Sequence, residues 1–297
     1  MKNIAVIGSG TMGNGIAHVF AQHGYKVSLV DISETALQKA LKTIEQNLHR
    51  QAKKGVIAEG DIPTILQNMK TYTNLAHGVK EADLAVEAAT ENIEVKLNIF
   101  RDLDTWCRPD TILATNTSSI SITKIASVTK RPDKVIGMHF MNPVPMMKLV
   151  EVINGYLTSH ETSQTIVSLA EKIGKTPITA NDYPGFVSNR ILMPMINEAI
   201  YALFTGVAGV AEIDAIMKLG MAHPMGPLQL ADFIGLDVCL AIMKVLQEGL
   251  GDDKYAPCPL LVNMVTAGHL GKKTGIGFYR YDTDSKDLVV APQFNRQ

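Results

Sequence analysis

The sequence predicts an α/β protein with a doubly wound, mostly parallel sheet, an inserted helical hairpin and an all-α domain after the sheet. Three observations predict it. Short apolar runs alternate with helical patterns through the first half of the 297-residue chain. The stretch from Asp31 to Asp83 is too long for an ordinary crossover, and after Tyr183 the pattern becomes helical. We therefore expect two domains, residues 1–182 and residues 183–297.

The strands of the first domain are predicted by short apolar runs. Their near-continuous apolar character is typical of parallel strands covered by helices on both faces. Five such runs occupy residues 4–8, 26–30, 84–88, 111–115 and 134–138. Two more, at residues 149–153 and 176–179, flank a helical pattern at 161–173.

The inserted hairpin is predicted in the long crossover. Residues from Glu34 to Met69 have the pattern of two antiparallel helices. A plain dinucleotide-binding sheet has no such insertion at this point.

The second domain is predicted by apolar residues at helical spacing. They recur between Phe186 and Leu203, where Pro194 is expected to kink the helix, and further helices are expected near 211–219 and 227–247. These apolar stripes, and the 14 methionines of the chain, favour a homodimer formed through this domain. The alternative, that the stripes serve only the domain's own core, fits the pattern equally well.

Composition excludes several classes of protein. The chain has 46% hydrophobic and 19% charged residues, and 28 basic against 29 acidic side chains give a formal net charge of −1. Disordered chains have few apolar residues, and nucleic-acid-binding proteins carry an excess of basic ones. We therefore expect a globular protein with no nucleic-acid partner.

Cysteine spacing and the apolar runs predict the compartment. Cys107, Cys239 and Cys258 lie far apart without a CxxC pair, so we expect no disulfide scaffold and no metal site. No apolar run approaches the length of a membrane helix, and the first strand begins too early to leave room for a signal peptide. The sequence predicts a cytoplasmic protein without a membrane partner.

A glycine-rich turn predicts a dinucleotide site and a Rossmann-type sheet. Gly8, Gly10 and Gly13, with Thr11 and Met12 between them, join the first strand to a helical pattern. In such a turn the glycines allow a tight bend, backbone approach to a pyrophosphate, and close packing of strand and helix. Asp31 ends the second strand, where a carboxylate accepts hydrogen bonds from ribose hydroxyls and repels a 2′-phosphate. The pattern favours NAD over NADP; the alternative is a strand–turn–helix without a ligand.

Polar residues at the carboxyl ends of later strands predict the chemistry. Asn116 and Ser118 follow the fourth predicted strand, His139 follows the fifth, and Glu151 lies in the next one after a short return. A histidine has a pKa suited to proton transfer near neutrality, and a carboxylate can hold its tautomer. Taken singly, each of the two residues is more often an ordinary buried histidine or a solvated charge.

Motifs along nearly the whole chain resemble the 3-hydroxyacyl-CoA dehydrogenase family. The motifs are GSGTMG, NTSS, HFMNP, LVEVI, PGFVSNRIL and GKKTGIGFYRY, in this order. The likeness is greatest to short bacterial members that act on 3-hydroxybutyryl-CoA. The resemblance implies an NAD-dependent oxidation of a (3S)-3-hydroxyacyl-CoA to a 3-oxoacyl-CoA, and the reverse reaction, in a cleft between the two domains.

Carried over to this sequence, the family's functional residues fall on specific positions. His139 is implied as the base and Glu151 as its supporting carboxylate, while Ser118 and Asn189 bind the substrate oxygens. Besides the glycine-rich turn and Asp31, the implied cofactor contacts are Glu91, Lys96, Asn116 and Lys273. Lys272, which neighbours Lys273, leaves the register of the last contact open.

The inserted helices are implied to bind the acyl-CoA. The segment from Gln38 to Lys54 has five basic residues and one acid, and Arg50, Lys53 and Lys54 are candidate partners for the CoA phosphates. A solvated helix face is the alternative for any one of them. Two other functions stay open: a dehydrogenase of free sugar acids related to the gulonate enzymes, and a non-catalytic NAD-binding module.

Overall fold

The computed structural model describes residues 1–281 and 288–295. The chain divides into two compact units, Met1–Tyr183 and Pro184–Gln297. Within the described residues, no helix is both long enough and apolar enough to span a bilayer.

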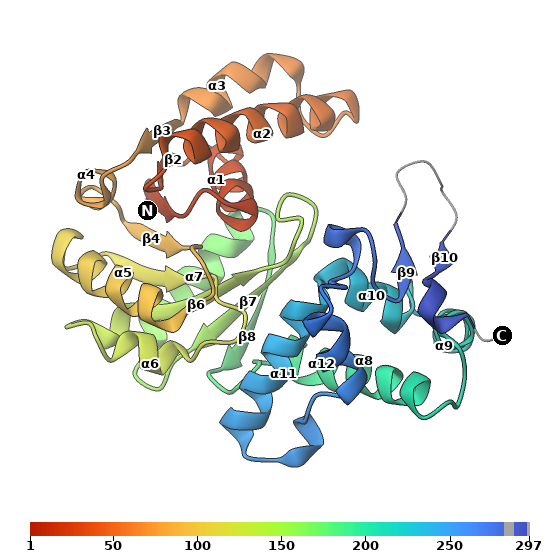
Figure 1. Ribbon diagram of the computed structural model, residues 1–297. Coiled ribbons are helices and arrows are strands. Elements are labelled where there is room, and N and C mark those ends of the chain that lie inside the picture. The colour runs from red at the N-terminus through yellow and green to blue at the C-terminus, as the bar shows by residue number, and fades with distance from the viewer. Residues whose placement is uncertain (282–287, 296–297) are drawn as a thin grey trace. The chain divides into compact units, whose positions relative to one another are not determined.

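The first unit is built around an eight-stranded sheet, shown in Figure 1. The strand order is β3-β2-β1-β4-β5-β6-β7-β8. All neighbouring pairs are parallel except β6 and β7, which are antiparallel. The strands are β1 (Asn3–Ile7), β2 (Lys26–Val30), β3 (Met69–Tyr72), β4 (Leu84–Glu87), β5 (Ile112–Thr115), β6 (Val135–Phe140), β7 (Leu149–Asn154) and β8 (Thr176–Asn181).

Helices connect these strands and cover the sheet, which confirms the predicted doubly wound class. They are α1 (Thr11–Gln22), α2 (Glu34–Lys53), α3 (Ile62–Gln67), α4 (Leu75–Val79), α5 (Ile93–Trp106), α6 (Ile122–Ala126) and α7 (His160–Lys172). The core between the layers is apolar and includes Ile4, Ile16, Phe20, Leu29 and Phe140. Dispersion and hydrophobic burial across these layers hold the strand ends in fixed positions.

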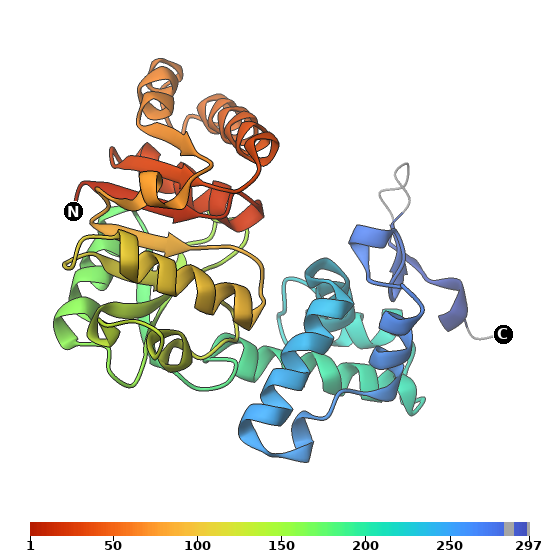
Figure 2. The same ribbon diagram turned by 60° about the vertical axis from the view of Figure 1, so that its left-hand side comes forward.

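The inserted hairpin consists of α2 and α3, which lie together at the β2–β3 end of the sheet (Figures 1 and 2). Ser33 caps α2, because its side chain accepts a hydrogen bond from the N–H of Ala36. Its buried face contains Leu37, Ala40, Ile44 and Leu48 at helical spacing. The predicted C-terminal end of the hairpin was wrong, because Met69 begins strand β3 and is not part of a helix. The four-residue strand MKTY has no apolar run by which it could be recognised.

The second unit is mainly helical, as predicted. Its helices are α8 (Ser188–Phe204), α9 (Val210–Gly220), α10 (Pro227–Ile234), α11 (Leu236–Leu250) and α12 (Pro259–Thr266), with a small ribbon of β9 (Tyr279–Arg280) and β10 (Val289–Val290). The helix expected at 227–247 is two helices. Gly235, at a φ of 102°, separates them, because an L-residue with a side chain rarely adopts that conformation.

Candidate active site

The glycine-rich turn between β1 and α1 has the steric form that a dinucleotide needs. A Cβ on Gly8, whose φ is +98°, would lie 2.6 Å from the carbonyl oxygen of Ala88, and one on Gly13 would lie 1.8 Å from that of Gly8. Gly10 differs, because a Cβ there would meet no protein atom within 4 Å. Two of the glycines are therefore required by the chain itself, while Gly10 leaves open space at the amino end of α1. This arrangement fits NAD, whose pyrophosphate is bound by helix N–H groups.

Asp31 fixes this turn and stays ionised. Its Oδ2 accepts hydrogen bonds from the N–H and the hydroxyl of Ser9, at 2.8 and 2.7 Å, and its Oδ1 accepts one from the N–H of Ser33 at 3.0 Å. Partial burial acts to raise the pKa of Asp31, but the hydrogen bonds from Ser33 and Ser9 outweigh it and lower this pKa. A carboxylate that is charged near neutrality can accept from ribose hydroxyls.

A hollow of about 540 Å³ opens beside this turn. Its lining includes Gly10, Thr11 and Asp31 from the dinucleotide turn. Across from them it includes a face of α2 and the loop after β6, namely Lys39, Thr43, Asn47, Asn142 and Pro143. Lys39 is one of the five basic residues noted in the sequence, whereas Thr43 and Asn47 were not predicted, although their spacing of four along one helix was a visible signal.

His139 and Glu151 are brought together by the register of β6 and β7. The two residues face each other across this antiparallel pair, and Nδ1 of His139 lies 2.8 Å from Oε2 of Glu151. Both are buried, with 9% and 3% of their surface exposed. An ionised Glu151 accepts the proton of Nδ1, which leaves Nε2 of the neutral ring as a proton acceptor. The structure thus brings together the two side chains that the sequence analysis paired, and their roles as base and orienting carboxylate stay a prediction.

The loop between these strands is pinned by a buried lysine. Lys175 is 9% exposed, and its Nζ donates to the carbonyl oxygens of Val144 and Met147, at 2.5 and 2.8 Å. On the other side, a Cβ on Gly15 would lie 2.9 Å from Cβ of Val144, so α1 packs closely on the loop. At the start of this loop, Oδ1 of Asn116 accepts from the N–H of Phe140 at 2.8 Å. These contacts fix the chain around His139.

Ser118 lies after β5 and contacts Glu91. Oε1 of Glu91 accepts from the N–H and the hydroxyl of Ser118, at 2.9 and 3.2 Å, while Oε2 lies 3.3 Å from Nζ of Lys96. Burial acts to raise the pKa of Glu91, but the charge of Lys96 and hydrogen bonds from Thr117 and Ser118 lower it. Ser118, Glu91 and Lys96, which the family resemblance implies as substrate and cofactor contacts, are therefore one connected group.

Behind this group lies Glu87, which the sequence analysis did not single out. Its two oxygens lie 2.8 and 2.9 Å from Nζ of Lys96, and neither side chain is more than 1% exposed. A lone acid inside the apolar run LAVEA was the signal that could have found it.

The remaining predicted site residues lie at the end of α2 and in the second unit. Arg50, Lys53 and Lys54 are exposed, and Nη1 of Arg50 donates to Oδ1 of Asn47 at 3.2 Å. Asn189 is the second residue of α8 and is 8% exposed. In the loop after α12, Lys273 pairs with Asp237, at 2.6 Å between Nζ and Oδ2. Nζ of Lys272 lies over the ring of Phe233, 4.3 Å from its centre.

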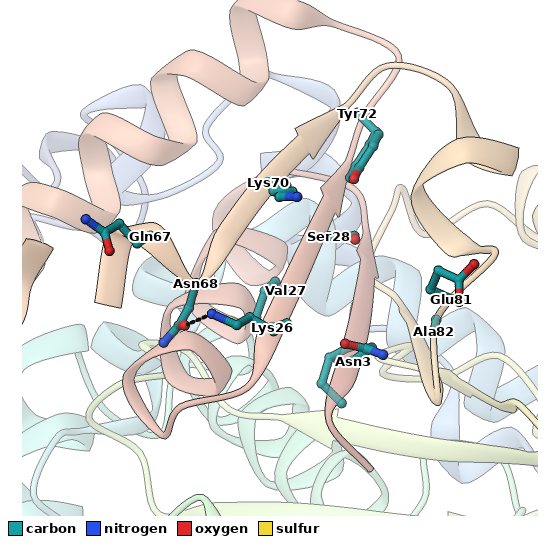
Figure 3. Close-up of a pocket in the computed structure, with 11 residues that line it drawn as sticks. Asn3, Lys26, Val27, Ser28, Gln67, Asn68, Lys70, Tyr72, Glu81 and Ala82 are labelled. Carbon is teal, nitrogen blue, oxygen red and sulfur yellow. Dashed lines mark hydrogen bonds between the residues drawn. The ribbon is translucent and has the colours of Figure 1, made fainter. Parts of the chain in front are cut away.

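A different hollow, of about 400 Å³, lies along β1, β2 and β3 away from this site (Figure 3). Asn3 and Lys26 begin their strands there, and Nζ of Lys26 donates to Oδ1 of Asn68 at 2.7 Å. Neither the glycine turn nor His139 contributes to its lining. Among the described residues, no cluster of three His, Cys, Asp or Glu side chains could hold a metal ion.

Comparison with known proteins finds the same family along both units. Residues 3–183 match the NAD-binding domain of 3-hydroxyacyl-CoA dehydrogenase, and residues 185–281 match its C-terminal domain. The chain is 54% identical to a probable 3-hydroxybutyryl-CoA dehydrogenase of Bacillus subtilis, over 95% of this chain and 98% of that one. It is also 54% identical to the 3-hydroxybutyryl-CoA dehydrogenase of Clostridioides difficile, over 94% and 99%. The crystal structure of (S)-3-hydroxybutyryl-CoA dehydrogenase from Ralstonia eutropha is similar at a TM-score of 0.92 and 49% identity, covering 95% of this chain and 100% of that one.

Proposed function

The chain belongs to the 3-hydroxyacyl-CoA dehydrogenase family, and we propose that it interconverts (3S)-3-hydroxybutyryl-CoA and acetoacetyl-CoA. As a member of this family it is an oxidoreductase that uses NAD. The short acyl chain and the S configuration come from the names of its relatives and of its structural neighbour.

The observation that carries the mechanism is the buried pair of His139 and Glu151. In the oxidation, Nε2 of His139 takes the proton of the C3 hydroxyl, and the positive charge that develops on the ring is stabilised by Glu151. NAD, when bound, supplies the acceptor for the hydride that leaves C3. In the reduction, the protonated ring of His139 returns the proton to the oxygen of the 3-oxo group.

Other residues hold the reactants. The turn with Gly8, Gly10, Thr11, Met12 and Gly13, together with Asp31, binds the cofactor. Glu91, Lys96, Asn116 and Lys273 are its further proposed contacts. Ser118 and Asn189 are the proposed donors of hydrogen bonds to the substrate oxygens.

The exposed face of α2 is the proposed site for the CoA moiety. Lys39, Thr43 and Asn47 line the hollow, and Arg50 and Lys54 continue that face at spacings of three and four residues. Lys53 lies about 100° around the helix from Lys54, at the edge of this face. This geometry favours Arg50 and Lys54 over Lys53 as partners for the phosphates.

Two broader features of the protein are also proposals. Exposed apolar residues on α9, including Ile216 and Leu219, favour a homodimer formed through the second unit. All three cysteines lie within the described residues and are buried free thiols, which is typical of proteins in the reducing cytoplasm.

The proposal is tested by following NADH absorbance with the purified protein. We expect rapid NADH oxidation with acetoacetyl-CoA and none with free acetoacetate. A protein that instead oxidised gulonate with NAD, and ignored every short 3-oxoacyl-CoA, would be a sugar-acid dehydrogenase. A protein that bound NADH without turning over either class would be a non-catalytic module.

A further inference from the structure

The fourth strand of the sheet ends on a buried carboxylate that the proposed mechanism does not use. Glu87 is the last residue of β4 and is a register partner of Ile7 on β1 and of Thr115 on β5. In a doubly wound sheet the ligand crevice opens where the strand order reverses, which here is between β1 and β4. Since its surface is 0% exposed, Glu87 lies beneath that crevice.

Both oxygens of Glu87 are held by several donors. Oε1 accepts from Nζ of Lys96 at 2.8 Å and from the N–H of Ala89 at 2.7 Å. Oε2 accepts from Nζ of Lys96 at 2.9 Å and from the hydroxyl of Thr115 at 2.7 Å. Ala88, next to Ala89, is the residue whose carbonyl oxygen lies against Gly8. Glu87 therefore connects the glycine-rich turn, β5 and Lys96.

From Lys96 the contacts continue outward to Ser118. Lys96 is 1% exposed and contacts Glu91, whose side chain is 40% exposed. Glu91 accepts hydrogen bonds from the N–H and hydroxyl of Ser118 and from the hydroxyl of Thr117. The series Glu87, Lys96, Glu91, Ser118 thus leads from the interior to the predicted substrate contact.

We propose that Glu87 is a positioning residue for the dehydrogenase reaction, and that it acts through Lys96. Burying an ammonium group is costly unless it is paired and hydrogen-bonded. Glu87 is the buried partner of Lys96 and holds its Nζ in place. Lys96 then holds Glu91, and Glu91 orients Ser118 at the edge of the crevice. The inference rests on the proposed function, because Ser118 has its role there.

A double variant separates positioning from simple stabilisation. Removing one partner of a buried ion pair is strongly destabilising, whereas replacing both by apolar side chains of similar volume is often neutral for folding. We therefore choose Glu87→Met with Lys96→Met, and Glu87→Gln as the single variant that retains Lys96. Glu94→Gln is the matched control, since Glu94 is an exposed glutamate on the same helix as Lys96.

Three measurements are made on each protein: the unfolding temperature, the NADH dissociation constant by fluorescence, and kcat with acetoacetyl-CoA at saturating NADH. We expect the double variant to fold, to bind NADH about tenfold more weakly, and to lose about a hundredfold in kcat, because a displacement of about 1 Å costs that much. Glu87→Gln should change NADH binding and kcat in the same direction, and Glu94→Gln should change neither.

A folded double variant whose NADH dissociation constant and kcat stay within about twofold of the parent would overturn the inference and leave the pair with a structural role. A folded Glu87→Gln protein with unchanged NADH binding and kcat would also overturn it; if that variant does not fold, the double variant decides. NADH binding is measured without substrate. If the parent and all its variants had no activity with acetoacetyl-CoA, the proposed function would be rejected. Weaker NADH binding in the Glu87 variants would still show that Glu87 positions the crevice residues.

Discussion

The two units bury their carboxylates in opposite ways. In the first unit, buried Glu87 and Glu151 each have a lysine or a histidine within 2.8 Å. In the second, Asp214 and Asp232 are similarly buried, and their hydrogen-bond donors among the described residues are neutral: backbone N–H groups and the hydroxyls of tyrosines. Burial raises the pKa of Asp214 and brings that of Asp232 to about 6.

This difference in partners predicts different roles: the carboxylates of the first unit support the reaction, and those of the second stabilise the fold. A carboxylate with a charged or chargeable partner can stabilise a changing charge during a reaction. Asp214 instead satisfies the first N–H groups of α10, at Leu228 and Gln229, and Asp232 satisfies those of Phe278 and Tyr279. Removing a carboxylate in the first unit should therefore affect turnover most, and removing one in the second should affect stability most.

The largest expected effect comes from breaking the pair in the first unit. Glu151→Gln keeps the shape but removes the charge that supports the imidazolium, so kcat should fall by about a thousandfold or more. The measurement is NADH oxidation with acetoacetyl-CoA. Glu161→Gln, an exposed acid on α7, is the control and should retain full activity. Equal activity of Glu151→Gln and Glu161→Gln would contradict the claim that the buried, paired carboxylates of the first unit support turnover.

Removing a buried carboxylate of the second unit should lower the free energy of unfolding. Asp232→Ala leaves the N–H groups of Phe278 and Tyr279 and the hydroxyl of Tyr281 without their acceptor, at a cost of about 3 kcal/mol in the free energy of unfolding. Chemical denaturation measures this loss. The exposed Asp253→Asn should lie within about 0.5 kcal/mol of the parent. A loss no larger than that of the control would show that these donors find other acceptors.

The pH dependence of stability sharpens the comparison. The pKa of Asp232 is raised from 3.8 to about 6 in the folded state, so the folded chain binds this proton more tightly than the unfolded chain. Its contribution to stability is full below about pH 4 and is lost as the pH rises through about 6. Because asparagine does not titrate, the free energy of unfolding of the parent should fall relative to that of Asp232→Asn by up to about 3 kcal/mol between these values. A constant difference would mean that Asp232 titrates normally.

Exposed charges should give the smallest effect. Lys54→Ala should raise the KM for acetoacetyl-CoA several-fold, about 1 kcal/mol, and the increase should shrink at high salt. Lys53→Ala is the matched control on the neighbouring side of α2 and should change the KM less. The KM of each variant is measured by steady-state kinetics at two ionic strengths. A larger increase in KM for Lys53→Ala than for Lys54→Ala would place the CoA on another face of the helix.

Much of the fold could be predicted because its signals are local. The apolar run KVIGM and the return to LVEVI predict two adjacent strands, and their register then brings His139 and Glu151 together. Strand β3 was missed because MKTY has no apolar run and is specified by pairing with β2. The break at Gly235 was missed because a single glycine is tolerated within a helical pattern.

The site was less predictable where it depends on contacts distant in sequence. The hydrogen bond between Phe140 and Asn116, and the contacts of Lys175 with the loop after β6, join residues 24 to 31 positions apart. No local pattern marks such partners. Glu87 had a local signal, an acid in a buried strand, but its partner Lys96 is recognised only in three dimensions.

The most direct test of the account is His139→Gln, measured for kcat with acetoacetyl-CoA and for NADH binding in the same preparation. We expect kcat to fall by at least about a hundredfold, because the variant has no group to carry the proton, while the NADH dissociation constant stays within about twofold. Full turnover in a variant that binds NADH normally would contradict the assignment of His139 and Glu151 as the proton-transfer pair.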